Sequence, residues 1–304
     1  YLDELHKRRI PVYSISSIFR RGQVFFRSYR YFSLLSAYGG VPWIDRVLSD
    51  NDTELINGPR ASRDEIAKHI LEDLQYAEQH INVNGDGNNT INRAVVQAFI
   101  SRFCLFEGTF RKYHGIAGYE TYLDKCISVS EDFITNSPYS IYKDGEKPYR
   151  DLFSSMDAIS QEVILARDYD KGKAVMHEAN YNTMGPTYGR PGMNKKVVNS
   201  YLMTDGSGFT DKEGYQTMQY YDEMQNRDPR LTQTVVGPGY TRINSTTVES
   251  PHNWKKHPET FHKNYSSHSL TPFHYYNKFP EPESQVEIYL TYQLLLADAC
   301  SGSI

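Results

Sequence analysis

A succession of amphipathic helices with clear start signals is the feature that most constrains how this chain folds. In the segment GPRASRDEIAKHILEDLQYAE, Ser62 stands three residues before Glu65, which is the spacing of a capping box. One apolar stripe then follows at helical spacing, made of Ile66, Ile70, Leu74 and Ala77. The sequence therefore predicts a helix over Arg63–His80 that starts at a capped end and buries one face.

Three other segments show the same helical pattern. Phe19–Tyr38 ends at two glycines, and Asn92–Glu107 is apolar on most sides and is expected to end at Gly108. Tyr119–Thr135 repeats the stripe with Tyr122, Cys126, Val129 and Phe133. Helices of this length joined by short to medium loops predict stacked helical hairpins of the tetratricopeptide type, although no clean sequence period is present.

The helical pattern fades between residues 137 and 280, where Gly, Pro, Tyr and Asn become frequent. Gln161–Tyr169 is predicted to be a short strand or an extended edge. Lys196–Gly206 is predicted to be one helix, and Tyr215–Asp228 another that ends before Pro229, because a residue preceding proline disfavours helix. Residues 285–299 return to a helical pattern. We thus predict a scaffold over 1–136, a loop-rich capping region over 137–280 and a returning scaffold helix over 281–304.

Composition excludes some classes of function. The net charge of −4 argues against a nucleic-acid partner, which usually requires a basic surface. No segment approaches the ~20 apolar residues of a membrane span. Of the three cysteines, Cys104 and Cys126 lie in helical patterns and are predicted to be buried free thiols. The chain opens without Met, and we expect segments to be missing at both termini.

Several blocks stand in an order that resembles a known family. They are YFSLLSAYGGVPWI, GPRASRDEIAKHILEDLQYAE, NRAVVQAFISRFCLFEG, MTDG and RDPRL. In this order and spacing they resemble the SusD/RagB family of outer-membrane nutrient-binding lipoproteins. The resemblance implies an all-helical, tetratricopeptide-like scaffold with an irregular capping region. The family's last helix usually carries an arginine, whereas VEIYLTYQLLLADA has none, so the alignment departs from the family there.

The resemblance also implies a partner and a location. The partner would be a TonB-dependent outer-membrane barrel of the SusC/RagA type, over which the protein sits as a lid. Family members are exposed at the cell surface and held by a lipidated N-terminal Cys, so the membrane would be reached only through the lipid anchor. The capped helix would then be scaffold, and function would lie on the loops that it presents.

Motifs for metals and catalysis are incomplete. NVNGDGNNTINR resembles a calcium loop, but Arg93 stands where the ligand Glu is needed. The zinc motif begun by His177-Glu178 lacks its second His, because Tyr181 occupies that position. The acidic pair Asp222 and Glu223 is interpreted as a solvated helix face. Five histidines between His252 and His274 are interpreted as solvated loop residues. We predict a binding protein without a metal, a cofactor or enzymatic activity.

Aromatic residues in loops are the positive signal for a ligand. Tyrosine is unusually frequent, with 25 residues against two Trp. Flat rings can stack on a sugar, while amide and guanidinium groups hydrogen-bond its hydroxyls. The loop Asp168–Gly192 combines both types of side chain, and the resemblance implies that this loop contributes to the binding face. The predicted ligand-binding residues are Tyr181, Tyr188 and Arg190 first, then Tyr169, Asn182, Trp43 and Trp254.

The sequence leaves three functions open. The preferred one is capture of an oligosaccharide for delivery to the transporter. A RagB-like lid that captures oligopeptides is the second, and a structural lid without its own ligand site is the third. Trp43 has a competing structural interpretation, a plug beneath the first pair of helices, and the loop residues could equally be structural.

Overall fold

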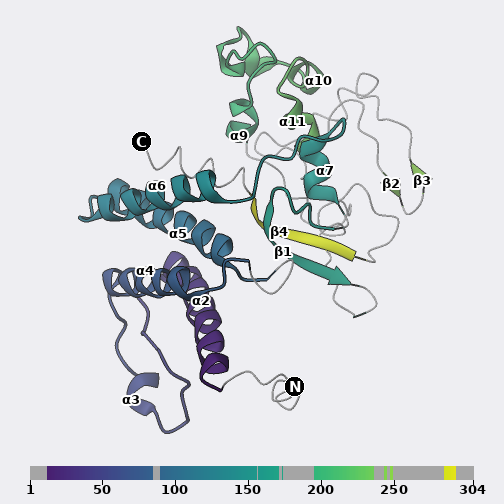
Figure 1. Ribbon diagram of the computed structural model, residues 1–304. Coiled ribbons are helices and arrows are strands. Elements are labelled where there is room, and N and C mark those ends of the chain that lie inside the picture. Colours follow the sequence, from purple (N-terminus) through teal and green to yellow (C-terminus); the bar gives the residue numbers. More distant parts are fainter. Residues whose placement is uncertain are drawn as a thin grey trace. The chain divides into compact units, whose positions relative to one another are not determined.

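The protein, in this computed structural model, divides into two compact units (Figure 1). Unit 1 comprises residues 1–140, 162–165 and 289–304, and unit 2 comprises the remainder. The structure describes residues 12–84, 90–155, 157–170, 173, 195–235, 243–244, 247–248 and 284–291. Helices predominate in these residues, which confirms the predicted helical class.

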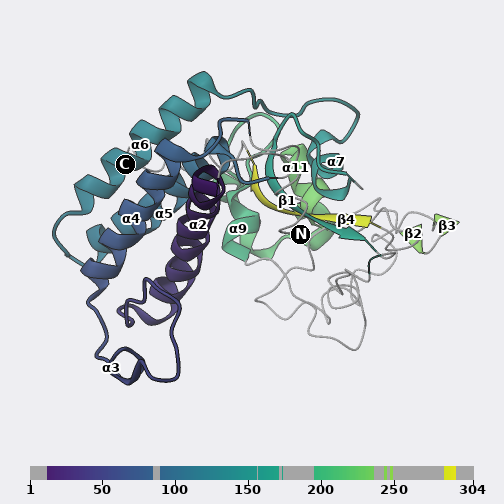
Figure 2. The same cartoon turned by 60° about the horizontal axis from the view of Figure 1, so that its bottom comes forward.

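Unit 1 is built on four long helices. Their bounds are α2 (Val12–Tyr38), α4 (Arg63–His80), α5 (Arg93–Tyr113) and α6 (Tyr119–Asn136), with the short α3 (Thr53–Ile56) between the first two. Figure 2 shows the same helices from a second direction. Among the helices that the structure describes, none is both long and apolar enough to cross a membrane.

The start of α4 confirms the predicted capping box. The Glu65 backbone N–H donates to Ser62 Oγ at 3.2 Å, and the Ser62 N–H donates to the Glu65 carboxylate at 3.0 Å. Two of the orphan donors of the first turn are thereby satisfied. The four predicted stripe residues of α4 are all fully buried, namely Ile66, Ile70, Leu74 and Ala77.

The long helices pack as antiparallel hairpins. The Arg27 guanidinium near the middle of α2 binds Asp73 in the second half of α4, and Arg63 at the start of α4 donates to the Leu35 carbonyl near the end of α2. In the second pair, Ser101 of α5 hydrogen-bonds Ser130 of α6 at 2.8 Å. This arrangement confirms the predicted tetratricopeptide-like scaffold.

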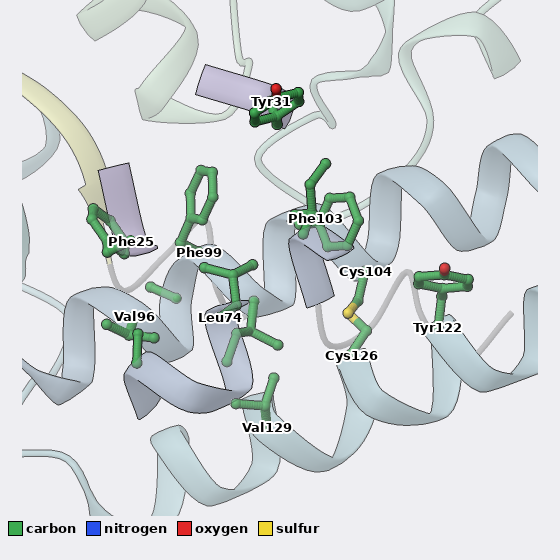
Figure 3. Packing of buried hydrophobic residues seen from close by; sticks show 14 of the residues in the cluster. Phe25, Tyr31, Leu74, Val96, Phe99, Phe103, Cys104, Tyr122, Cys126 and Val129 are labelled. Carbon is green, nitrogen blue, oxygen red and sulfur yellow. The ribbon is translucent and has the colours of Figure 1, made fainter. Parts of the chain in front are cut away.

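Aromatic rings join the two hairpins in one core, as Figure 3 shows for Phe25, Phe99 and Phe103. Phe25 contacts Phe99 edge-on, with ring centroids 5.6 Å apart, and Phe32 contacts Phe106 at 5.2 Å. Later residues of α2 contact later residues of α5, so the two helices run parallel. Edge-on pairs of this kind stabilise a core beyond the area they bury.

Gly108 does not end α5, which corrects the sequence prediction. The helix continues to Tyr113, and Gly108 lies inside it against Leu123 of α6. A Cβ at this position would lie 2.6 Å from Leu123 Cδ2 and 3.3 Å from the Leu123 backbone nitrogen. The glycine is therefore required for close approach of two helices and does not act as a C-terminal cap.

The two described cysteines are buried free thiols, as predicted. Cys104 and Cys126 extend from α5 and α6 into the same core (Figure 3). Burial raises the pKa of the Cys104 thiol well above its ordinary value, so this group remains protonated. Cys300 lies outside the described residues.

Unit 2 consists of short elements. The helices are α7 (Pro148–Ser154), α9 (Lys195–Ser200), α10 (Tyr220–Glu223) and α11 (Pro229–Thr234), with the 3-10 turns η2 (Phe209–Asp211) and η3 (Tyr215–Thr217). The two longer helices predicted here are therefore wrong. Pro229 begins α11 instead of marking the end of a preceding helix, because proline at the first helical position loses no hydrogen bond. Asp228 caps α11 by accepting from the Arg230 N–H.

The strands are few and short. β1 (Val163–Asp170) confirms the predicted strand, and it pairs with β4 (Ser284–Thr291). The predicted helix over residues 285–299 is thus wrong for 285–291, where Val286, Ile288 and Leu290 alternate with polar residues as in a half-buried strand. β2 (Ile243–Asn244) pairs antiparallel with β3 (Thr247–Val248). Residues 292–304 lie outside the described residues, and the predicted domain boundaries stay a prediction.

Two glycines on helices provide a matched test of the α5–α6 contact. We expect Gly108→Ala to lower the free energy of unfolding by about 1–3 kcal/mol, because the new methyl must displace Leu123. A Cβ on Gly22 in α2 would meet no atom within 4 Å, so Gly22→Ala should raise the free energy of unfolding by about 0.4–1 kcal/mol. Urea unfolding measures both. A Gly108→Ala protein as stable as Gly22→Ala would contradict the close contact.

Candidate functional site

The structure describes two of the predicted ligand-binding residues, one in each unit. Trp43 lies in the loop after α2, and Tyr169 lies on β1. The other predicted residues lie outside the described residues, namely Tyr181, Asn182, Tyr188, Arg190 and Trp254. The histidines from His252 to His274 lie outside them as well. The ligand contacts proposed for the first group, and the solvated loop positions expected for the histidines, remain predictions.

The turn before Trp43 is set by two glycines. Gly39 has φ +69°, a conformation that glycine adopts without strain, and its N–H donates to the Leu35 carbonyl to close α2. A Cβ on Gly40 would lie 2.2 Å from the Ala61 carbonyl oxygen, so only glycine fits. The YGGVP motif therefore brings the chain against the residues that precede α4.

Trp43 is held among side chains of α2 and α4. Its ring stacks on the His69 ring with centroids 4.4 Å apart, and the Tyr31 ring lies at the same centroid distance. The Arg27 guanidinium carbon lies 5.0 Å from the Trp43 ring centroid, within the range of a cation–π contact. This packing supports the structural interpretation of Trp43, because protein groups already cover much of its ring.

The Tyr31 hydroxyl fixes the backbone on both sides of Trp43. It accepts from the Ile44 N–H at 2.7 Å and donates to the Pro42 carbonyl at 3.1 Å. Tyr31 is itself 92% buried, with 8% of its surface exposed, so the loop is attached to the core through a buried ring. The arrangement orients Trp43 rigidly.

Tyr169 is buried on β1, with 8% of its surface exposed. The guanidinium carbon of Arg167 lies 5.0 Å from the centroid of its ring. A ring covered in this way offers little surface to a sugar in the conformation described. The burial of Tyr169 therefore favours a packing role at the start of the predicted loop Asp168–Gly192 over stacking on a sugar.

The two turns MTDG and RDPRL meet in unit 2. Met203 and Arg227 form an isolated antiparallel bridge, and the Thr204 N–H donates to the Asn226 carbonyl at 2.8 Å. Asn226 has φ +54°, a left-handed conformation that Asn tolerates better than most residues. Two stretches separated by more than twenty residues in the sequence thus form one local structure.

Arg227 organises this structure from a buried position. Its guanidinium donates to the backbone carbonyls of Val198, Tyr201 and Glu223, which lie at the ends of α9 and α10. The Phe209 ring lies 3.8 Å from the guanidinium carbon. Burial lowers the pKa of Arg227 from its ordinary value. One cation therefore caps the negative ends of two short helices.

The acidic pair on α10 is divided by the structure. Asp222 is exposed, as predicted for a solvated face, whereas Glu223 is buried and forms an ion pair with Lys195. The prediction for Glu223 is therefore wrong, because α10 is a single turn packed against α9 and not an exposed helix. In the part of the chain that the structure describes, no group of three His, Cys, Asp or Glu side chains is arranged to hold a metal.

Four exposed aromatic residues lie on the long helices and were not predicted as functional, one of them being Tyr38 of α2 at 65% exposure. Phe26 and Tyr29 of α2 are 56% and 40% exposed, and Tyr113 at the end of α5 is 79% exposed. Their positions in the sequence, outside the apolar stripe that each helix buries, could have indicated that they are exposed. Large apolar side chains exposed side by side can mark an interaction surface.

Comparison with known proteins finds a family match over part of the chain. The SusD family model matches residues 161–293, a range that includes β1, the loop Asp168–Gly192 and Trp254. No curated protein matches the sequence.

Solved structures share the fold. A SusD-like protein from Bacteroides fragilis aligns over 97% of this chain and 59% of its own, with a TM-score of 0.66 and 17% identity. A SusD-like carbohydrate-binding protein from the same organism aligns over 91% of this chain and 53% of its own, with a TM-score of 0.61 and 17% identity. A laminarin-binding SusD-like protein aligns over 97% and 62%, with a TM-score of 0.57 and 14% identity.

The chain thus spans between about half and three fifths of the length of these proteins. At such low identity the solved structures establish the fold and leave the ligand open. The predicted resemblance is confirmed in sequence over residues 161–293 and in fold over nearly the whole chain.

The environment of Trp43 makes a structural role testable. We expect Trp43→Ala to lower the free energy of unfolding by about 2–4 kcal/mol, because it removes the ring between Arg27, Tyr31 and His69. Val47→Ala in the same loop is the control, since Val47 is 96% exposed. Chemical denaturation measures both. Unchanged stability of Trp43→Ala together with lost ligand binding would instead make Trp43 a ligand contact.

The buried guanidinium of unit 2 gives a second test. Arg227→Met removes three hydrogen bonds from buried carbonyls and should destabilise the protein by about 3 kcal/mol or more. Arg230→Met should cost less than about 1 kcal/mol, because the exposed Arg230 only pairs with the neighbouring Asp228. Thermal unfolding and limited proteolysis report the difference. Equal effects of the two substitutions would refute the capping role of Arg227.

Proposed function

Because this chain carries the SusD family pattern over residues 161–293 and has the fold of SusD-like proteins, we propose that it is a cell-surface protein that captures oligosaccharide. The observation that carries the proposal is the family match, since it spans the aromatic and amide-rich loop Asp168–Gly192. Two proteins of the same fold are described as carbohydrate-binding and laminarin-binding, respectively. These descriptions support a glycan ligand for this chain.

The proposed mechanism is non-covalent binding. Tyr181 and Tyr188 would stack on the apolar faces of sugar rings, while Asn182 and Arg190 would hydrogen-bond hydroxyl groups. Tyr169, Trp43 and Trp254 complete the proposed set, although the packing of Tyr169 and Trp43 favours supporting roles. A shallow site leaves polar groups imperfectly paired, so we expect moderate affinity.

The proposed destination of the ligand is a transporter. In this proposal the protein sits as a lid on a TonB-dependent outer-membrane barrel of the SusC/RagA type and releases the glycan into it. A lipid anchor would hold the protein at the outer membrane and bring it close to the barrel. Neither role requires a catalytic group or a cofactor, because capture and release depend only on binding.

Calorimetry with the purified chain tests the binding step. We expect saturable heat with one class among plant, host and microbial glycans, and a loss of affinity of about tenfold or more in Tyr181→Ala or Tyr188→Ala. Tyr38→Ala is the matched control, because Tyr38 is 65% exposed at the end of α2 and outside the proposed site.

The other results distinguish the alternatives. Heat only with a pool of peptides would replace the glycan by an oligopeptide. Absence of heat with every glycan and peptide, with normal binding to the barrel, would leave a purely structural lid. Release of shorter products from a bound glycan would contradict the assignment as a binding protein without enzymatic activity.

A further inference from the structure

The charges of unit 1 are segregated between its helices. α2 carries four arginines and no carboxylate, and α5 carries four cations and the single carboxylate Glu107. In contrast, α4 and α6 carry five and four carboxylates, against two cations and one. The parallel helices α2 and α5 are thus basic in a protein whose net charge is −4. Such segregation leaves positive charge on α2 and α5 wherever a cation has no carboxylate partner on a neighbouring helix.

Ion pairs with the acidic helices account for some of these cations. Arg27 of α2 binds Asp73 of α4, and Arg111 of α5 binds Asp64 of α4 and Glu107 within its own helix. Among the arginines of α2 and α5 whose side chains the structure describes, two are left over. Arg30 of α2 and Arg102 of α5 make no hydrogen bond or ion pair with any described residue.

Both unpaired arginines stand beside aromatic rings. Arg30 follows Tyr29 and lies one helical turn after Phe26, on the side of α2 opposite the buried Tyr31 and Leu35. Arg102 lies one turn before Phe106 on α5. Tyr113 continues the same row two turns further on.

These two rows share one surface. The Tyr29 ring lies 5.5 Å from the Phe99 ring, and Phe32 lies 5.2 Å from Phe106, so aromatic contacts connect α2 to α5 along their length. α4 packs against both helices, and side chains turned away from α4 therefore come to lie on the same side. We call this surface the basic aromatic face. It comprises Phe26, Tyr29, Arg30 and Tyr113, which are exposed, and Arg102 and Phe106, which are half-buried.

Neither α2 nor α5 places an opposing charge on this face. The one carboxylate of α2 and α5, Glu107, is fully buried and already bound by Arg63 and Arg111. Phe26, Tyr29 and Tyr113 are exposed by between 40% and 79%. A ligand that suits this surface has flat apolar patches to cover the rings and carboxylates to meet the guanidinium groups, which bind carboxylates through paired hydrogen bonds.

From this combination we propose that the basic aromatic face binds acidic oligosaccharide, with Arg30 and Arg102 contacting the carboxylates of uronic acid residues. A uronic acid combines the two features in one unit, because its ring has apolar C–H faces and its C6 is a carboxylate. The inference rests on the proposed glycan capture and narrows it to carboxylated glycans. It also adds a binding surface on the helical scaffold to the one proposed on the loops.

A pair of glycans that differ only in charge tests the inference. Oligogalacturonate and its carboxyl-reduced product have the same linkages, and both are titrated into the whole chain by calorimetry at low and high ionic strength. We expect the acidic glycan to bind about tenfold tighter or more at low salt, and the preference to shrink at high salt. Arg30→Gln and Arg102→Gln should each reduce binding of the acidic glycan about tenfold, and the double variant should remove the preference.

Lys68→Gln is the matched control. It also removes one positive charge, but from the exposed surface of the acidic helix α4. The affinity of Lys68→Gln for oligogalacturonate should equal that of the unaltered chain. Circular dichroism and thermal unfolding check that Arg30→Gln and Arg102→Gln keep the fold, as the exposed position of Arg30 and the absence of a described partner for either side chain predict.

Four results would overturn the inference. Equal affinity for both glycans would leave glycan capture standing and remove the acidic specificity. Tight binding of oligogalacturonate with the same affinity in Arg30→Gln and Arg102→Gln would place the site for acidic glycans elsewhere. Stronger, arginine-dependent binding of polyglutamate would make the face a docking surface for an acidic protein segment. No binding of any glycan by the chain would end both proposals.

Discussion

The helical scaffold depends on one buried carboxylate. Glu107 of α5 is fully buried and is held by Arg63 at 2.7 Å and by Arg111 at 2.8 Å. Arg63 begins α4 and also donates to the Leu35 carbonyl of α2, while Arg111 donates to the Ala117 carbonyl in the connection to α6. Glu107 thus joins α4 to α5, and its two arginine partners extend the network to the end of α2 and to the connection before α6. Loss of one partner from such a buried pair typically costs about 3–5 kcal/mol, because the remaining charge stays desolvated.

This network also explains how the charges of the helices are distributed. A buried carboxylate on α5 requires cations on both sides, and Arg111 provides one of them from the same helix. Asp64 at the start of α4 then pairs with Arg111, where a carboxylate also complements the helix dipole. Acidic helix starts and basic α5 are therefore two parts of one electrostatic arrangement. Arg30 and Arg102 have no place in it, which is why a partner outside the scaffold is proposed for them.

Local signals predicted the scaffold well, and tertiary contacts account for the errors. The capping box and the stripe of α4 depend only on neighbouring residues, and both are found as predicted. The sequence predicts that Gly108 ends α5, but the glycine is needed inside the helix because Leu123 of α6 packs against it. A proline such as Pro229 is compatible with the end of one helix or with the start of another. The cap formed by Asp228 shows that Pro229 starts α11. For residues 285–291, pairing with β1 overrides a helical pattern.

The site is harder to predict than the fold because aromatic residues serve packing and binding equally well. Trp43 follows a glycine-rich turn and appeared suitable for a ligand, yet His69, Tyr31 and Arg27 surround its ring. Phe26 lies next to the buried Phe25 in the sequence and is more than half exposed. Periodicity identifies the buried face of a helix, and residues outside that face are then expected to be exposed. An exposed ring beside an unpaired arginine therefore indicates binding more strongly than the frequency of tyrosine does.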